Sequence, residues 1–150
     1  MSSVTVPDIQ QAQQRIQPYI NQTPILESSL LNEWLGHRIL FKAECLQKVG
    51  AFKIRGALNM LLKAQEQGTL ASHIVASSSG NHAQAVAYAA KLLDKKATVF
   101  SGQSISSVKA AATRAYGAEL KLYATRKEAD EQVKLAASQP DTLWVPDKVR

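Results

Sequence analysis

From residue 73 onward, short apolar stretches alternate with longer segments whose apolar residues recur at helical spacing. The short stretches predict strands and the longer ones predict helices, in the order 73–77, 81–93, 96–100, 107–116, 119–123, 127–138 and 142–145. Strands that alternate with helices of about ten residues or more join through right-handed crossovers into a mostly parallel sheet. The sequence therefore predicts an α/β fold in which a mostly parallel open sheet is flanked by helices.

The first third of the chain predicts a less regular arrangement, punctuated by proline and glycine. Its predicted elements are a helix over 9–16 capped by Asp8, an extended segment at 23–26, a short helix at 30–35 capped by Ser28 or Ser29, and a strand at 38–44. A further helix follows Lys53 and ends before Gly68.

The composition argues against several classes of protein. With 45% apolar and 20% charged residues over 150 positions, the chain resembles one ordinary globular domain. Its net charge is +6, yet the 18 basic residues are scattered and not interleaved with aromatic ones, so we predict no nucleic-acid partner.

The single cysteine, Cys45, excludes a multi-cysteine metal site, and we predict no metal. No apolar run approaches the roughly 20 residues that span a bilayer, and the start lacks a signal peptide, so we predict no membrane partner and a cytoplasmic location.

Lys53 stands in the stretch 47–57, where a glycine-bounded turn opens a predicted helix. Lysine is unusual in a first helical turn, because the positive end of the helix dipole and the neighbouring Arg55 both disfavour its ammonium form. A neutral amine is a nucleophile that forms Schiff bases with aldehyde cofactors and carbonyl substrates. Lys53 is therefore a candidate nucleophile, although a lone lysine on an amphipathic helix is more often a surface residue.

A second polar motif, Ser-Ser-Ser-Gly-Asn-His-Ala-Gln, occupies residues 77–84, between a predicted strand and a predicted helix. Backbone N–H groups gather at such a junction, so an anion can bind there. Gly80 permits a tight turn, and Asn81 offers an amide that can reach a ring substituent or a carboxylate. Taken alone the motif is weak, because serine and asparagine are also ordinary helix caps. A nucleotide- or phosphate-binding domain is a more distant alternative that no GxGxxG or Walker sequence supports.

Together these motifs closely resemble those of the pyridoxal-phosphate enzymes of the threonine/serine dehydratase and serine racemase family. The similar stretches are Lys42-Ala43-Glu44, Gln47, 50–57, 78–84, 112–119 and Thr23-Pro24-Ile25. The resemblance implies fold type II, the tryptophan synthase β-like two-domain fold, with pyridoxal 5'-phosphate as cofactor. Ile54 and His82 favour the dehydratase branch, because cysteine and threonine synthases usually have aspartate and threonine there. Val49 departs from the threonine that several relatives carry.

The resemblance also implies roles for the residues around the cofactor. Lys53 is the lysine that holds pyridoxal phosphate covalently and then removes or returns the Cα proton of the substrate. Phe52 is a neighbour of the cofactor ring, and Asn81 hydrogen-bonds the ring hydroxyl.

For the substrate, the resemblance implies that Ser78, Ser79, Asn81 and His82 surround its carboxylate. Ser79 matches the position that acts as acid or base on the opposite ring face in racemases. The implied reaction removes the β-hydroxyl of threonine or serine and yields a 2-oxo acid and ammonia. Alternatives are a serine racemase-type activity and a non-catalytic, truncated homologue that acts as a binding module.

The resemblance further implies a division of the chain. We expect residues 1–71 to begin the larger pyridoxal-phosphate domain, which carries Lys53, and residues 72–150 to form the smaller α/β domain. The remainder of the larger domain, with its glycine-rich phosphate loop, is expected beyond residue 150, so the chain alone is expected to be inactive. The complete enzyme is expected to be a homo-oligomer. Without the remainder, we expect poor order before about residue 71 and exposure of five apolar side chains: Leu31, Trp34, Leu35, Phe41 and Leu61.

Overall fold

The computed structural model describes residues 4–147. In chain order its elements are α1 (Val6–Ile16), a 3-10 turn (Gln17–Tyr19), β1 (Ile25–Glu27), α2 (Ser29–Leu35), β2 (Leu40–Lys42), two 3-10 turns (Glu44–Leu46 and Lys48–Gly50), α3 (Lys53–Glu66), β3 (His73–Ser77), α4 (Asn81–Leu92), β4 (Lys96–Gly102), α5 (Ser107–Ala115), β5 (Glu119–Tyr123), α6 (Arg126–Ala137) and β6 (Thr142–Trp144).

Strands β3 to β6 form one parallel sheet in the order β5-β4-β3-β6. The predicted alternation of strands and helices is therefore confirmed. After β3 the chain adds β4 and β5 on one side and then returns to place β6 on the other. The order reverses between β3 and β6, and in open α/β sheets such a switch point opens a crevice at the carboxyl ends of the strands.

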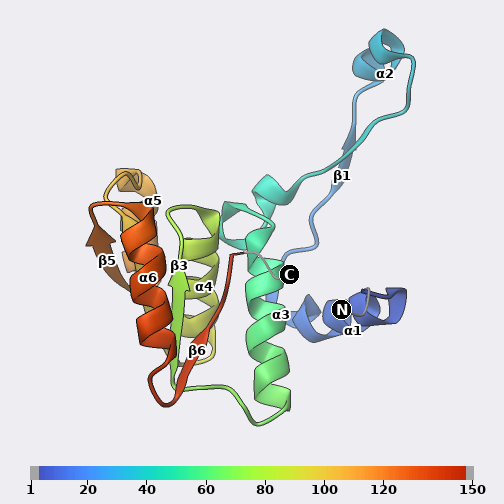
Figure 1. Ribbon diagram of the computed structural model, residues 1–150. Coiled ribbons are helices and arrows are strands. Elements are labelled where there is room, and N and C mark those ends of the chain that lie inside the picture. Colours follow the sequence, from blue (N-terminus) through green and yellow to red (C-terminus); the bar gives the residue numbers. More distant parts are fainter. Residues whose placement is uncertain (1–3, 148–150) are drawn as a thin grey trace.

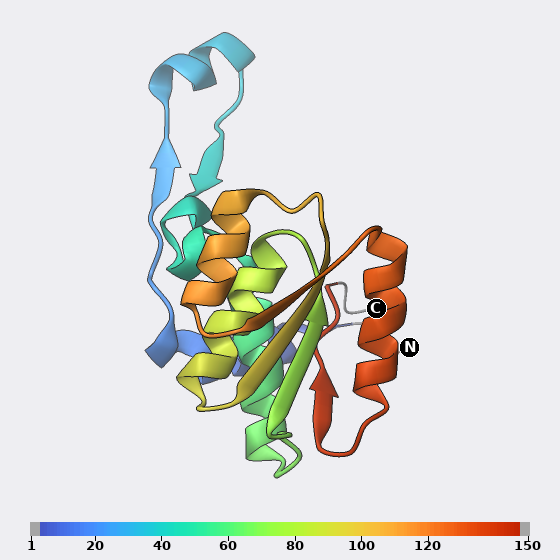
Figure 2. The same ribbon diagram turned by 90° about the vertical axis from the view of Figure 1, so that its left-hand side faces the viewer.

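Helices cover both faces of this sheet, with α4 and α5 on one side and α6 on the other (Figure 2). Alternate side chains of β3 point to opposite faces of the sheet and pack against the helices on each side, as expected for a strand. Ile74 and Ala76 join the larger core cluster with α4, whereas Val75 packs with Val133 of α6 in a second cluster. The two central strands, β3 and β4, are thus buried on both faces, as strands of parallel sheets usually are.

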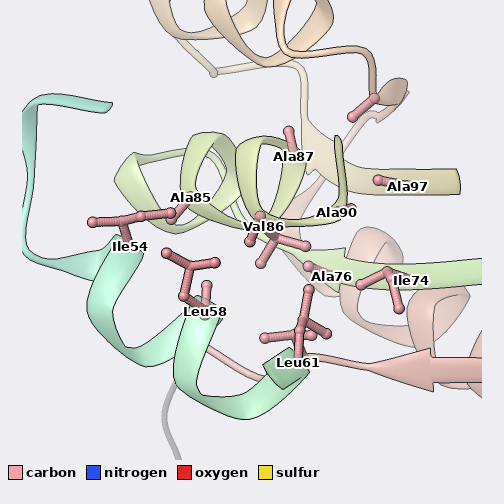
Figure 3. Packing of buried hydrophobic residues seen from close by; sticks show 14 of the residues in the cluster. Ile54, Leu58, Leu61, Ile74, Ala76, Ala85, Val86, Ala87, Ala90 and Ala97 are labelled. Atoms are coloured by element: carbon pink, nitrogen blue, oxygen red, sulfur yellow. The ribbon is translucent and has the colours of Figure 1, made fainter. Parts of the chain in front are cut away.

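Helix α3 packs along α4 and is part of the main core (Figure 3). Ile54, Leu58 and Leu61 point from α3 toward Val86 of α4 and Ile74 of β3. The expected exposure of Leu61 is therefore wrong, since its side chain is 0% exposed. The helical spacing of these residues turns them all to one face of α3, and α4 covers that face.

Residues 25–42 form an arm that projects away from the sheet (Figure 1). In it β1 and β2 pair antiparallel, with Leu26 opposite Phe41, and α2 lies at the far end. Ser28 caps α2, and Gly36 ends it in a left-handed conformation, as predicted.

Most of the apolar side chains that were expected to be exposed on this arm are exposed. Trp34 is 81% exposed, and Leu35 and Phe41 are exposed too, which confirms the expectation for these three. Leu31 is half-buried instead.

The start of α1 differs from the prediction. Thr5, not Asp8, is the N-cap, and its side chain accepts a hydrogen bond from the backbone N–H of Asp8. Asp8 in turn accepts from the Thr5 backbone N–H at 2.8 Å, which completes a capping box. Both residue types are good caps, so the sequence pattern allowed either.

The expected division at residue 71 stays a prediction, and its outer ends, residues 1–3 and 148–150, lie outside the described part of the chain. The main core cluster crosses the expected boundary, because α3 precedes it and α4 follows it.

Candidate active site

The turn before Lys53 is held in a restricted backbone conformation. Val49 and Gly50 both have positive φ, at 59° and 68°. Glycine adopts this region freely, but a β-branched residue there is strained. The Gln47 side chain stabilises the turn through two hydrogen bonds of 2.8 Å. Its Oε1 accepts from the Asn21 backbone N–H, and its Nε2 donates to the Asn21 carbonyl. These contacts fix the position from which α3 starts at Lys53.

Lys53 is the first residue of α3, and its side chain is 28% exposed. Its Nζ donates to the Asp147 carboxylate at 2.8 Å and to the Asp147 backbone carbonyl at 2.9 Å. Burial would raise the pKa of the Asp147 carboxyl, but the hydrogen bond from Lys53 and the positive charges of Lys53 and Arg126 lower it overall. The sequence favoured a free amine, whereas in the structure the amine is hydrogen-bonded to the Asp147 carboxylate.

His82 is buried on the first turn of α4, and its Nε2 lies 3.0 Å from the Val145 carbonyl. A carbonyl only accepts, so Nε2 carries the proton. Burial lowers the pKa of His82 despite this hydrogen bond, so the ring is neutral at pH 7. Nδ1 then faces the Asp147 carboxylate at 4.0 Å without a proton to donate. His82 thereby anchors the segment that follows β6 beside Lys53.

The polar motif forms the turn between β3 and α4, as predicted. Ser78 is buried, and its hydroxyl accepts from the Gly80 N–H at 3.1 Å. Ser79 is half-buried, while Asn81, the first residue of α4, is exposed. Ser77 faces the other layer, where its hydroxyl donates to Asp130 at 2.5 Å.

A cavity of about 210 Å³ lies beside Lys53. Three of the predicted site residues line it, namely Lys53, Phe52 and His82. Ser78, Ser79 and Asn81 do not line it; they lie in the turn that leads into His82. The remaining walls are mostly apolar and include Met60, Val145 and Pro146.

Two charged residues beside this site were missed by the sequence reasoning. Asp147 follows β6 and binds a lysine 94 positions earlier, a pairing that no local pattern indicates. Arg126 begins α6, and its Nη2 donates to the Ser77 carbonyl at 3.1 Å. An arginine at the positive end of a helix destabilises the helix. Its unfavourable position was the sequence feature that could have identified Arg126 as a candidate site residue.

The chemistry of the cavity fits pyridoxal phosphate. An aldehyde needs a primary amine at the end of a flexible stem, and a pyridine ring needs flat apolar walls. Lys53 provides the amine, and the half-exposed ring of Phe52 provides one such wall. The Lys53 Nζ lies 5.6 Å from the centre of that ring.

Comparison with known proteins places the chain in a family. Residues 16–148 match the family described as pyridoxal-phosphate dependent enzyme. The chain belongs to this family, and the resemblance found in the sequence is confirmed.

Its relatives are ammonia-lyases and racemases. The L-threo-3-hydroxyaspartate ammonia-lyase of Saccharomyces cerevisiae is 43% identical over 95% of this chain and 44% of that protein. The serine racemase of Dictyostelium discoideum is 44% identical over 79% of this chain and 36% of that protein. The chain therefore spans less than half the length of these curated relatives.

Solved structures agree on the fold. A pyridoxal 5'-phosphate-dependent aspartate racemase superposes with a TM-score of 0.89 at 35% identity, over 97% of this chain and 46% of that one. The serine racemase of maize gives a TM-score of 0.88 at 32% identity, over 96% of this chain and 44% of that one. The neighbours include enzymes of the predicted fold type II, which confirms the fold class.

Two further features concern residues 4–147 only. None of their helices combines the length and the apolarity that crossing a bilayer requires. They also contain no group of three or more His, Cys, Asp or Glu side chains suited to a metal ion.

The contact with Asp147 gives a prediction about the reactivity of Lys53. Replacing Asp147 with asparagine should speed covalent capture of pyridoxal phosphate by Lys53 by up to about fivefold, because a part-exposed ion pair is worth about 1 kcal/mol or less. The measurement is the rate of borohydride-fixed label on Lys53. Asp94→Asn makes the same change at an exposed position near the amino end of β4 and should leave the rate unchanged. Slower capture in Asp147→Asn would mean that the carboxylate activates the amine instead.

Proposed function

We propose that this chain contributes the lysine-bearing half of the active site of a pyridoxal-phosphate-dependent ammonia-lyase that acts on β-hydroxy amino acids. The observation that carries the proposal is the meeting of Lys53 and His82 on one cavity at the switch point of the sheet. The substrate is threonine or serine, as the sequence resemblance implies. The named activities of the relatives support lyase and racemase chemistry equally.

In this proposal Lys53 has two tasks. It holds the cofactor covalently, with Phe52 against the ring and Asn81 toward the ring hydroxyl. When bound, pyridoxal phosphate supplies an electron sink for the negative charge that develops at the substrate Cα. The Lys53 amine removes the Cα proton and can return it, which requires that the amine leave Asp147.

The turn between β3 and α4 has the other tasks. Ser78, Ser79, Asn81 and His82 bind the substrate carboxylate, helped by the N–H groups at the start of α4. The Ser79 hydroxyl can transfer a proton on the opposite face of Cα, which is what racemisation needs beyond elimination. Serine racemase-type activity is therefore the second candidate, and a non-catalytic binding module the third. We further propose a cytoplasmic homo-oligomer as the complete enzyme.

The test is covalent labelling. The purified chain is incubated with pyridoxal phosphate and reduced with borohydride, and the modified lysine is located by peptide mass spectrometry. We expect stoichiometric label at Lys53 and none in Lys53→Ala. Lys63→Ala removes an exposed lysine from the same helix and should keep the label at Lys53. Label scattered over surface lysines in the unaltered chain would contradict the proposal.

A further inference from the structure

Gly56 is a glycine in helix α3 whose backbone does not require it. It is the fourth residue of the helix, and its φ lies outside the left-handed region that favours glycine. Glycine in a helix is destabilising relative to alanine, because its backbone loses more freedom on folding. Neither backbone conformation nor helix propensity therefore explains a glycine at this position.

Close packing within the fold does not explain Gly56 either. Apart from its chain neighbours and the adjacent backbone of α3, no heavy atom of residues 4–147 lies within 4 Å of the position that a Cβ would occupy. The core-facing side of the helix, with Ile54, Leu58 and Leu61, points the other way, toward α4 and β3 (Figure 3). A side chain at residue 56 would therefore leave the core undisturbed.

Gly56 lines the cavity beside Lys53. Residues three and four apart on a helix share a face, so Gly56 lies next to Lys53. Phe52 and Met60 lie four positions away in either direction, and all four residues line this cavity of about 210 Å³. Ligand pockets usually measure roughly 300–1,000 Å³, so room beside the Lys53 amine is scarce. Side-chain atoms added at residue 56 would reduce that room further.

We propose that the absent side chain of Gly56 determines which aldehydes Lys53 can bind. It leaves beside the amine the room that an aromatic ring requires, so that pyridoxal phosphate fits and a larger residue at this position would exclude it. This inference rests on the proposed function and adds to it a residue that selects the cofactor by size. The glycine destabilises its own helix, a trade-off between stability and function that is common at active sites.

Gly56 also borders a second cavity, so the two surroundings have to be separated by experiment. This cavity of about 380 Å³ lies between α1 and α3, and its walls include Ile9, Ile16 and Asn59. Lys53 does not line it. The size of the aldehyde that Lys53 accepts therefore reports on the first cavity and not on the second.

The test compares two aldehydes on the same amine. In each reaction the Lys53 amine attacks the aldehyde carbon, water leaves, and borohydride then adds hydride to the C=N bond. Label at Lys53 is measured by peptide mass spectrometry over a range of aldehyde concentrations. Gly56→Leu should raise the half-maximal concentration of pyridoxal phosphate about tenfold, an effect of the order that overpacking produces. Formaldehyde, which has no ring, should label Lys53 at the same concentration in both proteins.

Two further variants complete the comparison. Gly56→Ala should raise the urea midpoint of unfolding, because alanine is the better helix former, and should weaken capture of pyridoxal phosphate less than Gly56→Leu does. Gln65→Leu adds the same side chain at an exposed position of α3 that does not line the cavity. This matched control should leave the half-maximal concentrations of both aldehydes unchanged.

Three outcomes would overturn the inference. Unchanged capture of pyridoxal phosphate in Gly56→Leu would show that the ring does not use this space, and would assign the glycine to the cavity between α1 and α3. Equal weakening for formaldehyde would mean that the substitution displaces Lys53 itself. A lowered urea midpoint in Gly56→Ala would make the glycine a structural requirement of α3. In all three, stoichiometric label at Lys53 in the unaltered chain would still support the proposed function, whereas scattered label would remove both.

Discussion

The Leu58→Ala variant is expected to lose about 3 kcal/mol of unfolding free energy, the usual cost of truncating a buried leucine in a core that cannot collapse around the cavity. Leu58 is 0% exposed and lies in the cluster that joins α3 to α4 and the sheet. Because α3 begins at Lys53, the same change should also reduce covalent labelling of Lys53 by loosening the helix that positions the amine.

Urea unfolding followed by tryptophan fluorescence measures this loss. Trp144 is half-buried in the second core cluster and reports on the sheet, whereas Trp34 lies exposed on the arm, so both proteins are studied with Trp34→Phe in the background. Leu30→Ala removes the same atoms from a side chain that is 75% exposed and should shift the midpoint little. An unchanged Trp144 transition in Leu58→Ala would mean that α3 unfolds independently, as a boundary at residue 71 would allow.

Acidification is expected to remove about 2 kcal/mol of stability through Glu44, because this carboxyl titrates far below its ordinary range. Arg55 donates to both carboxylate oxygens, at 2.7 Å and 2.8 Å. Against the opposing effect of burial, and with help from the Thr23 hydroxyl, these hydrogen bonds lower the pKa of Glu44 from 4.5 to about 2. The stabilisation is complete above pH 4.5 and is lost as the pH falls from there through about 2.

This contribution is measured as the urea unfolding free energy at pH 7 and pH 3. Glu44→Gln should be less stable than the unaltered chain at pH 7, and the difference should shrink at pH 3. Glu33→Gln is the matched control, because within residues 4–147 the Glu33 carboxylate has no hydrogen bond or ion pair. A difference at pH 7 that persists unchanged at pH 3 would show that Glu44 contributes through packing and not through its charge.

Much of the secondary structure followed from the sequence, because it depends on neighbours in the chain. The predicted strands at 73–77 and 119–123 match β3 and β5 at both ends, and the helix at Lys53 begins where the glycine-bounded turn placed it. The cap of α1 was misassigned to Asp8, since Thr5 and Asp8 share one capping box and only their backbone conformation separates the roles.

The sequence identified the individual motifs of the candidate site but not how the fold brings them together. The two motifs identified Lys53 and the serine turn by themselves, because a first-turn lysine and a strand-to-helix polar turn are local patterns. The roles assigned to the six site residues remain predictions. No local pattern predicts that β6 lies beside β3. This placement brings Asp147 to Lys53 and Val145 to His82.

The sequence by itself thus determined which segments are helices and strands and which residues can react, because backbone propensity and side-chain chemistry are properties of short stretches. The tertiary structure alone decided that Leu61 is buried, that the Lys53 amine meets a carboxylate, and that Arg126 stands beside the serine turn. These facts depend on the order of strands in the sheet and on which helix covers which face. That order is set by the burial of apolar surface summed over the whole core, to which residues far apart in the sequence contribute.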